Sequence, residues 1–387
     1  MSLEEIHRTK IEKVEKLHKA GIDPYPASSG RTNNIADALK NFDTFAQNKK
    51  ELTLAGRVMA RREHGGSVFF DLRDQDSKIQ GFIKEDVVGK DIFSRFSELV
   101  DRGDFIEIGG TLFKTKKEEK TLEVKNFKIL TKALLPLPEK WHGLQDVEER
   151  LRKRYLDLIM NPSERELFVK KANFWQTTRG FLLKEGGLEV ETPVLEQIPG
   201  GADAEPFSTH LNALDIDLYL RISPELSLKK LIVAGYEKIF EIGRIFRNEG
   251  IDREHLQDYT QMEMYWAYTD CTQLMKVVEK LIKETIEATI GSLTHEYQSQ
   301  KINWGGEWKH YDYYKEFEKY TGLDLSKVTE KDLKHYAEKE NIEIDKHIGR
   351  GRLIDIIFKK KVRLNLVEPG FLLLPPADIE PLAKRWS

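Results

Sequence analysis

Apolar and polar residues alternate along residues 238–246 and again along residues 258–266, on either side of a charged segment. This pattern is typical of a long β-hairpin, because successive side chains of a strand point to opposite faces. One face of this hairpin would carry Arg247, Gln261, Glu263 and Tyr265 together. Solvated charges are the simpler interpretation of such a face. The apolar residues on both faces argue against it, since a strand with one wet face should be more polar.

The first third of the chain has two other patterns. Apolar residues between positions 3 and 17 recur at near-helical spacing, and Gly21 follows as a C-terminal stop. Residues 52–131 read as five short strands separated by turn residues, with a helical insertion near residues 91–100. Five short strands favour a small barrel of the OB type, a fold that commonly binds single-stranded oligonucleotides.

The pattern after the predicted barrel indicates a linker and two helices. Three prolines and a dense run of charges between residues 131 and 162 are typical of a linker that runs into a helix. Residues 163–184 read as a helix that begins at Ser163 as N-cap. Farther along, Ser223 is expected as the N-cap of another helix. Glu225 would then lie in its first turn, where the helix dipole favours an ionised carboxylate.

Composition limits the classes of protein that fit. Of the 387 residues, 33% are charged and 40% hydrophobic, which is typical of a soluble globular protein with a sizeable core. The net charge of −3 gives no overall basic field, so an RNA partner would need local basic patches. The single cysteine, Cys271, excludes an internal disulfide framework and a cysteine-based zinc site. Without a long apolar run or a signal peptide, we expect a cytoplasmic protein that does not contact membranes.

Two runs of residues carry a family resemblance. Residues 246–250 read FRNEG, His255 follows, and residues 259–268 read YTQMEMYWAY. These runs resemble motif 2 of the class II aminoacyl-tRNA synthetases. Glu263 and Tyr265 narrow the resemblance to the lysyl-tRNA synthetases of subclass IIb. It extends over nearly the whole chain, from the first helix to Arg385.

The resemblance implies a two-step reaction that attaches L-lysine to tRNA(Lys). The lysine carboxylate would attack the α-phosphate of ATP, and the lysyl group would then pass from lysyl-adenylate to the tRNA. Arg247 is the implied catalytic group, because a guanidinium can align the carboxylate and the phosphate and offset their charge. Mg²⁺ is expected to accompany ATP, but no metal ligands are expected among these residues.

Three sets of binding residues follow from the resemblance alone. The ATP-binding set is Arg247, Asn248, Glu249, His255, Leu256 and Tyr259, with Tyr259 stacking on adenine. The lysine-binding set is Gly201, Glu225, Arg247, Glu263 and Tyr265, with Glu225 receiving the α-amino group and Glu263 and Tyr265 the ε-ammonium. The anticodon-binding set is Arg62, Phe69, Gln80 and Asn126. Many family members have a glutamate where this chain has Asn126, which leaves anticodon discrimination open.

The implied fold is α+β: an N-terminal OB-fold β-barrel, then a class II antiparallel sheet flanked by helices. We expect a helical segment over residues 1–50, the anticodon-binding barrel over residues 51–135, a linker over residues 136–162 and the catalytic domain over residues 163–387. The helix at 163–184 and the short strand ending at Pro193 resemble motif 1, which implies a homodimer. No counterpart of motif 3 is recognisable after Tyr268. A C-terminally truncated catalytic domain is therefore expected, one that makes little or no lysyl-adenylate.

Two other interpretations remain open at this point. An aspartyl- or asparaginyl-tRNA synthetase of the same subgroup would share motif 2, but Glu225 and Glu263 would then face an acidic or amide substrate. A non-catalytic tRNA-binding paralogue or a gene fragment is the alternative from a different class. Pyrophosphate exchange that depends on a particular amino acid would separate the three.

Overall fold

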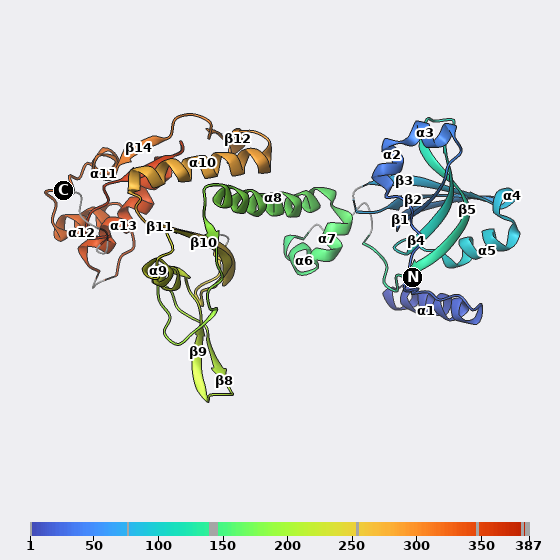
Figure 1. The fold of residues 1–387 in the computed structure, drawn as a ribbon, viewed down its shortest axis with the longest axis horizontal. Coiled ribbons are helices and arrows are strands. Elements are labelled where there is room, and N and C mark those ends of the chain that lie inside the picture. The colour runs from blue at the N-terminus through green and yellow to red at the C-terminus, as the bar shows by residue number, and fades with distance from the viewer. Residues whose placement is uncertain are drawn as a thin grey trace. The chain divides into compact units, whose positions relative to one another are not determined.

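The structure is a computed structural model, and it describes residues 2–75, 77–138, 146–252, 255–345, 348–380 and 383. It divides into two compact units, Met1–Pro162 and Ser163–Ser387 (Figure 1). Arg385, where the family resemblance was expected to end, lies outside the described residues, as do residues 139–145 of the expected linker.

The first unit is built from short helices around long, curved strands. Its elements are α1 (Leu3–Lys19), α2 (Ile35–Lys40), α3 (Phe42–Gln47), β1 (Glu51–His64), β2 (Ser67–Arg73), β3 (Lys78–Lys84), α4 (Glu85–Val88), α5 (Lys90–Leu99), β4 (Phe105–Lys114), β5 (Lys120–Thr131), α6 (Val147–Arg152) and α7 (Arg154–Met160).

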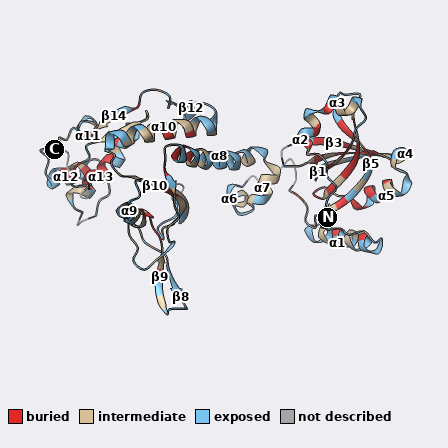
Figure 2. Ribbon diagram, viewed as in Figure 1, coloured by how far each residue is buried: buried red, intermediate tan, exposed pale blue. Residues whose placement is uncertain are grey.

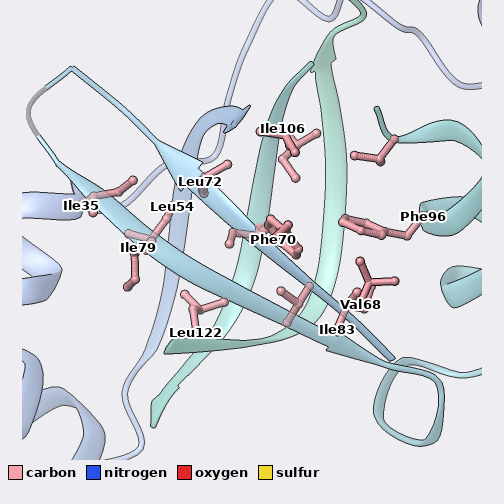
Figure 3. Packing of buried hydrophobic residues seen from close by; sticks show 14 of the residues in the cluster. Ile35, Leu54, Val68, Phe70, Leu72, Ile79, Ile83, Phe96, Ile106 and Leu122 are labelled. Atoms are coloured by element: carbon pink, nitrogen blue, oxygen red, sulfur yellow. The ribbon is translucent and has the colours of Figure 1, made fainter. Parts of the chain in front are cut away.

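The strands of the first unit form a closed barrel in the order β1-β2-β3-β5-β4, which confirms the predicted OB-type barrel. Alternate residues of each strand point inward and form one apolar core (Figure 3). Phe70 is fully buried there and packs against Phe96 of α5, with 5.0 Å between the ring centroids. A Cβ at Gly81 would lie 2.2 Å from the Phe70 ring, so only glycine leaves room for that ring.

Buried charges hold α1 against the barrel. Lys132 is 2% exposed and donates to Asp104 at 2.5 Å and to Asp101 at 2.6 Å. Asp101 also accepts from Lys13 of α1 at 2.6 Å, and Lys10 donates to the carbonyl of Ala133 at 2.9 Å. The predicted N-terminal helix therefore packs on the barrel through charge-assisted bonds as well as through Leu17.

The second unit combines a long hairpin with helices. Its elements are α8 (Pro162–Lys184), β6 (Leu188–Glu189), β7 (Leu195–Glu196), β8 (Ser208–Leu211), β9 (Ile216–Leu220), α9 (Glu225–Val233), β10 (Lys238–Phe246), β11 (Asp258–Trp266), α10 (Cys271–Ile290), β12 (Thr294–Tyr297), β13 (Gln300–Asn303), β14 (Lys309–Asp312), α11 (Tyr313–Thr321), α12 (Glu330–Lys339), α13 (Arg350–Ile357), the π-helix η1 (Phe358–Val362), the 3₁₀ helix η2 (Arg363–Asn365) and β15 (Gly370–Leu373).

The hairpin β10–β11 is antiparallel, as predicted, and β6 joins it in parallel on the β10 side. A second antiparallel sheet has the order β7-β9-β8. Phe181 and Leu182 of α8, Phe240 of β10 and Leu281 of α10 form the apolar core beside the hairpin. The rest of α8 is largely exposed (Figure 2). These findings confirm the expected α+β architecture: an OB-type barrel followed by a unit of antiparallel sheets with helices.

Two predicted helix starts are wrong by one or two residues. Helix α8 begins at Pro162, so Ser163 is not its N-cap. Helix α9 begins at Glu225 with Pro224 as N-cap, although the Ser223 hydroxyl still accepts a hydrogen bond from the Glu225 N–H at 3.1 Å. The Ser223 hydroxyl has a second partner, Glu263, to which it donates at 2.7 Å. No helix in the described part of the chain is long and apolar enough to cross a membrane.

Candidate amino-acid and nucleotide site

The strand register of the hairpin decides which side chains share a face. Tyr265 lies opposite Ile239, Glu263 opposite Glu241, and Gln261 opposite Gly243. Residues directly opposite each other in an antiparallel pair point to the same side. The predicted polar face with Gln261, Glu263 and Tyr265 is therefore confirmed. Arg247 follows β10 at the end of the hairpin, where its N–H donates to the carbonyl of Gln257 at 2.8 Å.

Glu263 accepts three side-chain hydrogen bonds on this face. Ser223 Oγ and Gln261 Nε2 both donate to its Oε1, at 2.7 and 2.5 Å, and the Tyr265 hydroxyl donates to its Oε2 at 3.1 Å. Burial raises the pKa of the Tyr265 phenol, and the carboxylates of Glu263 and Glu225 raise it further. Tyr265 therefore stays protonated at neutral pH and acts as a donor.

The loop before β8 packs closely on the start of α9, next to the Ser223 that bonds to Glu263. Gly201 has φ = 87°, and a Cβ on it would lie 2.8 Å from the Glu225 Cβ and 3.1 Å from Ser223 Oγ. Only glycine suits this conformation and this approach. Glu225 accepts a hydrogen bond from Lys229 at 2.6 Å, one helical turn away. The structure thus brings together four of the residues expected to contact lysine: Gly201, Glu225, Glu263 and Tyr265.

A pocket of about 300 Å³ lies beside Arg247. Its lining residues are Arg247, Glu249, Gly250, His255, Leu256 and Tyr259. The Arg247 guanidinium carbon lies 5.7 Å from the Tyr259 ring centroid, and Arg247 Nε approaches the carbonyl of Ile222 at 3.4 Å. The pocket includes all the residues expected to bind ATP except Asn248, whose N–H donates to the carbonyl of Glu205 at 2.7 Å. An arginine beside an aromatic ring suits a nucleotide phosphate and base.

Sequence reasoning missed a buried ion pair on the same face of the hairpin, where Glu241 lies opposite Glu263. Arg221 and Glu241, 2% and 3% exposed, are joined by a charge-assisted hydrogen bond. Thr192 donates to Glu241 Oε2 at 2.7 Å and accepts from Arg221 at 3.2 Å. A Cβ at Gly243 would collide with the Arg221 guanidinium, so this glycine leaves the space that the ion pair occupies. Glu241, a charged residue inside the apolar run of β10, is the sequence signal from which this ion pair could have been predicted.

The barrel carries a second candidate surface on its outer face. Arg62 lies opposite Phe69 across β1 and β2, and Gln80 accepts a hydrogen bond from Thr121 on the neighbouring β5 at 3.0 Å. Asn126 is exposed and its side chain lies over Gly109. Phe69 stacks on Phe82 with 4.5 Å between ring centroids, and Phe113 lies 6.0 Å beyond Phe82. Phe82 and Phe113 were missed, although alternation along β3 and β4 would have placed both outward.

Metal ligands are a separate question, because the family resemblance implies magnesium. Over the ranges that the structure describes, no group of three or more His, Cys, Asp or Glu side chains is arranged to hold a metal ion. No step of the chemistry is therefore assigned to a metal held by these residues.

Comparison with known proteins matches both units. Residues 146–386 match the family of class II tRNA synthetases (D, K and N), and residues 52–130 match the OB-fold nucleic acid binding domain. The chain is 43% identical over 384 residues to a lysine–tRNA ligase of Carboxydothermus hydrogenoformans, covering 99% of this chain and 78% of that protein. It is 42% identical to the lysine–tRNA ligase of Roseiflexus castenholzii (100% and 79% covered) and 40% identical to that of Bacillus subtilis (98% and 77% covered). From these matches and the site geometry, the chain belongs to the lysine–tRNA ligase family of class II tRNA synthetases.

Proposed function

We propose that this chain selects L-lysine and ATP at the β10–β11 face for the formation of lysyl-adenylate and the charging of tRNA(Lys). The observation that carries the proposal is the half-buried Glu263 carboxylate with Tyr265 beside it and Glu225 at the start of α9. Three groups that favour a cation in one partly buried site suit an amino acid with two amino groups. An aspartate side chain would instead meet carboxylates at both ends.

Arg247 is the group proposed to align the reactants. It lies at the end of the hairpin, where it lines the pocket that Tyr259 also lines. A guanidinium there can donate to the lysine carboxylate and to the α-phosphate, which draws the nucleophile and the phosphorus together and offsets their charge. Tyr259 would stack on adenine. Magnesium would arrive with the ATP phosphates and neutralise part of their charge.

The function is tested by ligand binding and by exchange together. Equilibrium dialysis with labelled lysine measures recognition separately from turnover. Amino-acid-dependent pyrophosphate exchange is then measured with lysine, aspartate and asparagine. Binding and exchange that respond to aspartate or asparagine instead of lysine would overturn the proposal.

The barrel is proposed to hold the anticodon of tRNA(Lys) through Arg62, Phe69, Gln80 and Asn126. Phe69→Ala should weaken tRNA binding by about 1–3 kcal/mol, because one base loses its aromatic stacking partner. Fluorescence anisotropy with a labelled tRNA(Lys) transcript measures this loss. Lysine binding should not change, since Phe69 belongs to the other compact unit.

The matched control is Phe45→Ala on α3, a half-buried phenylalanine that packs against the barrel core and is not one of the stacked rings Phe69, Phe82 and Phe113. It tests whether loss of any barrel-packing ring gives the same result. An equal loss of tRNA affinity in both variants would mean that Phe69 acts only by supporting the barrel.

A homodimer through α8 is also proposed. Leu167 and Val169 are 55% and 60% exposed on this helix, and Leu183 is half exposed. An exposed apolar helix surface of this kind is typical of an interface, and two-fold pairing would cover it. Sedimentation at micromolar concentration should give a dimer mass, and Leu167→Glu should shift it toward the monomer. A monomer mass for the unaltered chain would contradict the proposal.

A further inference from the structure

Ser223 links the Glu263 carboxylate to the backbone of Glu225 in the candidate lysine site. Its side chain is almost fully buried, at 3% exposure. The hydroxyl donates its one proton to Glu263 Oε1 at 2.7 Å and accepts from the N–H of Glu225 at 3.1 Å. A serine hydroxyl has one donor and two acceptor positions, so these two bonds fix its direction. Glu225 and Glu263 are thereby tied to one short element, although they lie 38 residues apart on α9 and β11.

Gln261 holds the same oxygen of Glu263 from the other side. Its Oε1 accepts from the Tyr259 hydroxyl at 2.9 Å, and its Nε2 donates to Glu263 Oε1 at 2.5 Å. The bond to Glu263 fixes which end of the amide is the nitrogen, because a carboxylate only accepts and therefore needs a donor. A chain of hydrogen bonds therefore runs along β11 from Tyr259, which lines the nucleotide pocket, to Glu263.

The segment that carries Ser223 is itself firmly held. The N–H of Phe246 donates to the carbonyl of Arg221 at 3.1 Å, and the Arg221 side chain is fixed by Glu241 and Thr192. On its other side, Gly201 approaches Ser223 so closely that a Cβ would lie 3.2 Å from the Ser223 Cβ. A side chain on such a support can hold a binding group in place.

These bonds leave the two oxygens of Glu263 in different states. Oε1 accepts from two donors, whereas Oε2 accepts only the 3.1 Å bond from Tyr265 among the bonds found in the described residues. Since each carboxylate oxygen has about two acceptor positions, Oε2 keeps one for a ligand. We infer that Ser223 and Gln261 are positioning residues that turn Oε2 of Glu263 toward the lysine ε-ammonium. Because Ser223 bonds both the Glu263 carboxylate and the Glu225 backbone, it also sets how Glu263 lies relative to the start of α9, and the site thereby favours the length of lysine. This inference rests on the proposed function.

A double-mutant cycle tests the inference. Ser223→Ala and Gln261→Met are each made in the unaltered chain and in the Glu263→Gln background, and dissociation constants for lysine and ornithine are measured by equilibrium dialysis. Each single variant should weaken lysine binding roughly tenfold, because a hydrogen bond to a charged group is lost. In the Glu263→Gln background, the same changes should weaken lysine binding by less than about twofold, because the carboxylate that Ser223 and Gln261 position has already been replaced. Ser223→Ala should also reduce the preference for lysine over the shorter ornithine.

The control is Ser292→Ala, which removes a serine hydroxyl that donates to the carbonyl of Thr294 in a distant turn. It should leave both dissociation constants unchanged. If Ser223→Ala lowers affinity equally in both backgrounds, the hydroxyl only supports the fold and the inference fails. If Glu263→Gln weakens lysine binding while neither Ser223→Ala nor Gln261→Met does, the inference fails and the proposed function stands. If Glu263→Gln leaves lysine binding unchanged, both fail.

Discussion

Replacing Glu263 by glutamine is expected to weaken lysine binding by about 2–4 kcal/mol, or roughly 30- to 900-fold. Glutamine has nearly the same shape, and its oxygen can still accept from Ser223 and Gln261 in place of Oε1. Its NH₂ group would then stand where Oε2 now faces Tyr265. The ε-ammonium is itself a donor and would face this NH₂ group instead of an anion. In such a partly buried site, water cannot fully replace the lost interaction.

Isothermal titration of lysine into the unaltered chain and the Glu263→Gln variant measures this change. The matched control is Glu237→Gln, an exposed glutamate just before β10. It should leave the affinity unchanged, because a solvated carboxylate outside the face adds little to binding. Equal affinities in the unaltered chain and the Glu263→Gln variant would show that the ammonium binds elsewhere.

The second large effect is expected in stability. Arg221→Met should lower the free energy of unfolding of the second unit by about 3–5 kcal/mol. The substitution keeps most of the length of the side chain but removes the guanidinium that pairs with Glu241. Glu241 is only 3% exposed and would keep Thr192 as a partner, which cannot neutralise its charge.

Urea unfolding followed by tryptophan fluorescence reports chiefly on this unit, because five of the six tryptophans lie in it and one, Trp141, lies in the first unit. The control is Arg179→Met, which breaks the partly exposed pair with Glu189 and should cost at most about 1 kcal/mol. Adding Glu241→Leu to Arg221→Met should recover part of the loss, because no unpaired charge then remains buried. If Arg221→Met cost no more than its control, the buried pair would not be a major source of stability.

The hairpin face and the barrel could be predicted because both follow from a period of two along the strands. That period alone put Glu263 and Tyr265 on one face, and the structure confirms this. The resemblance in motif 2 then pointed to the residues around the nucleotide pocket, where all but Asn248 line the cavity.

The buried network could not be predicted in the same way. Arg221 and Glu241 belong to different elements, and only the packing of β9, β10 and the Thr192 segment decides that they meet. Ser223 was read as a helix cap because its local sequence suits one. Its hydrogen bond to Glu263 spans 40 residues and depends on how α9 lies against β11. Helix starts shifted by one or two residues for a related reason, since the position of a cap depends on the partners available to it.

The central claim is that the hairpin face selects an amino acid with two amino groups. Its most direct test is equilibrium dialysis of labelled lysine against the unaltered chain and the Glu263→Gln variant, with unlabelled lysine, ornithine or aspartate as competitor. We expect unlabelled lysine to displace the label from the unaltered chain, ornithine to do so less well, and aspartate to fail at a hundredfold excess. We also expect the variant to lose most of the binding. Displacement by aspartate as effective as displacement by lysine, or a variant that binds the label as tightly as the unaltered chain, would contradict this account.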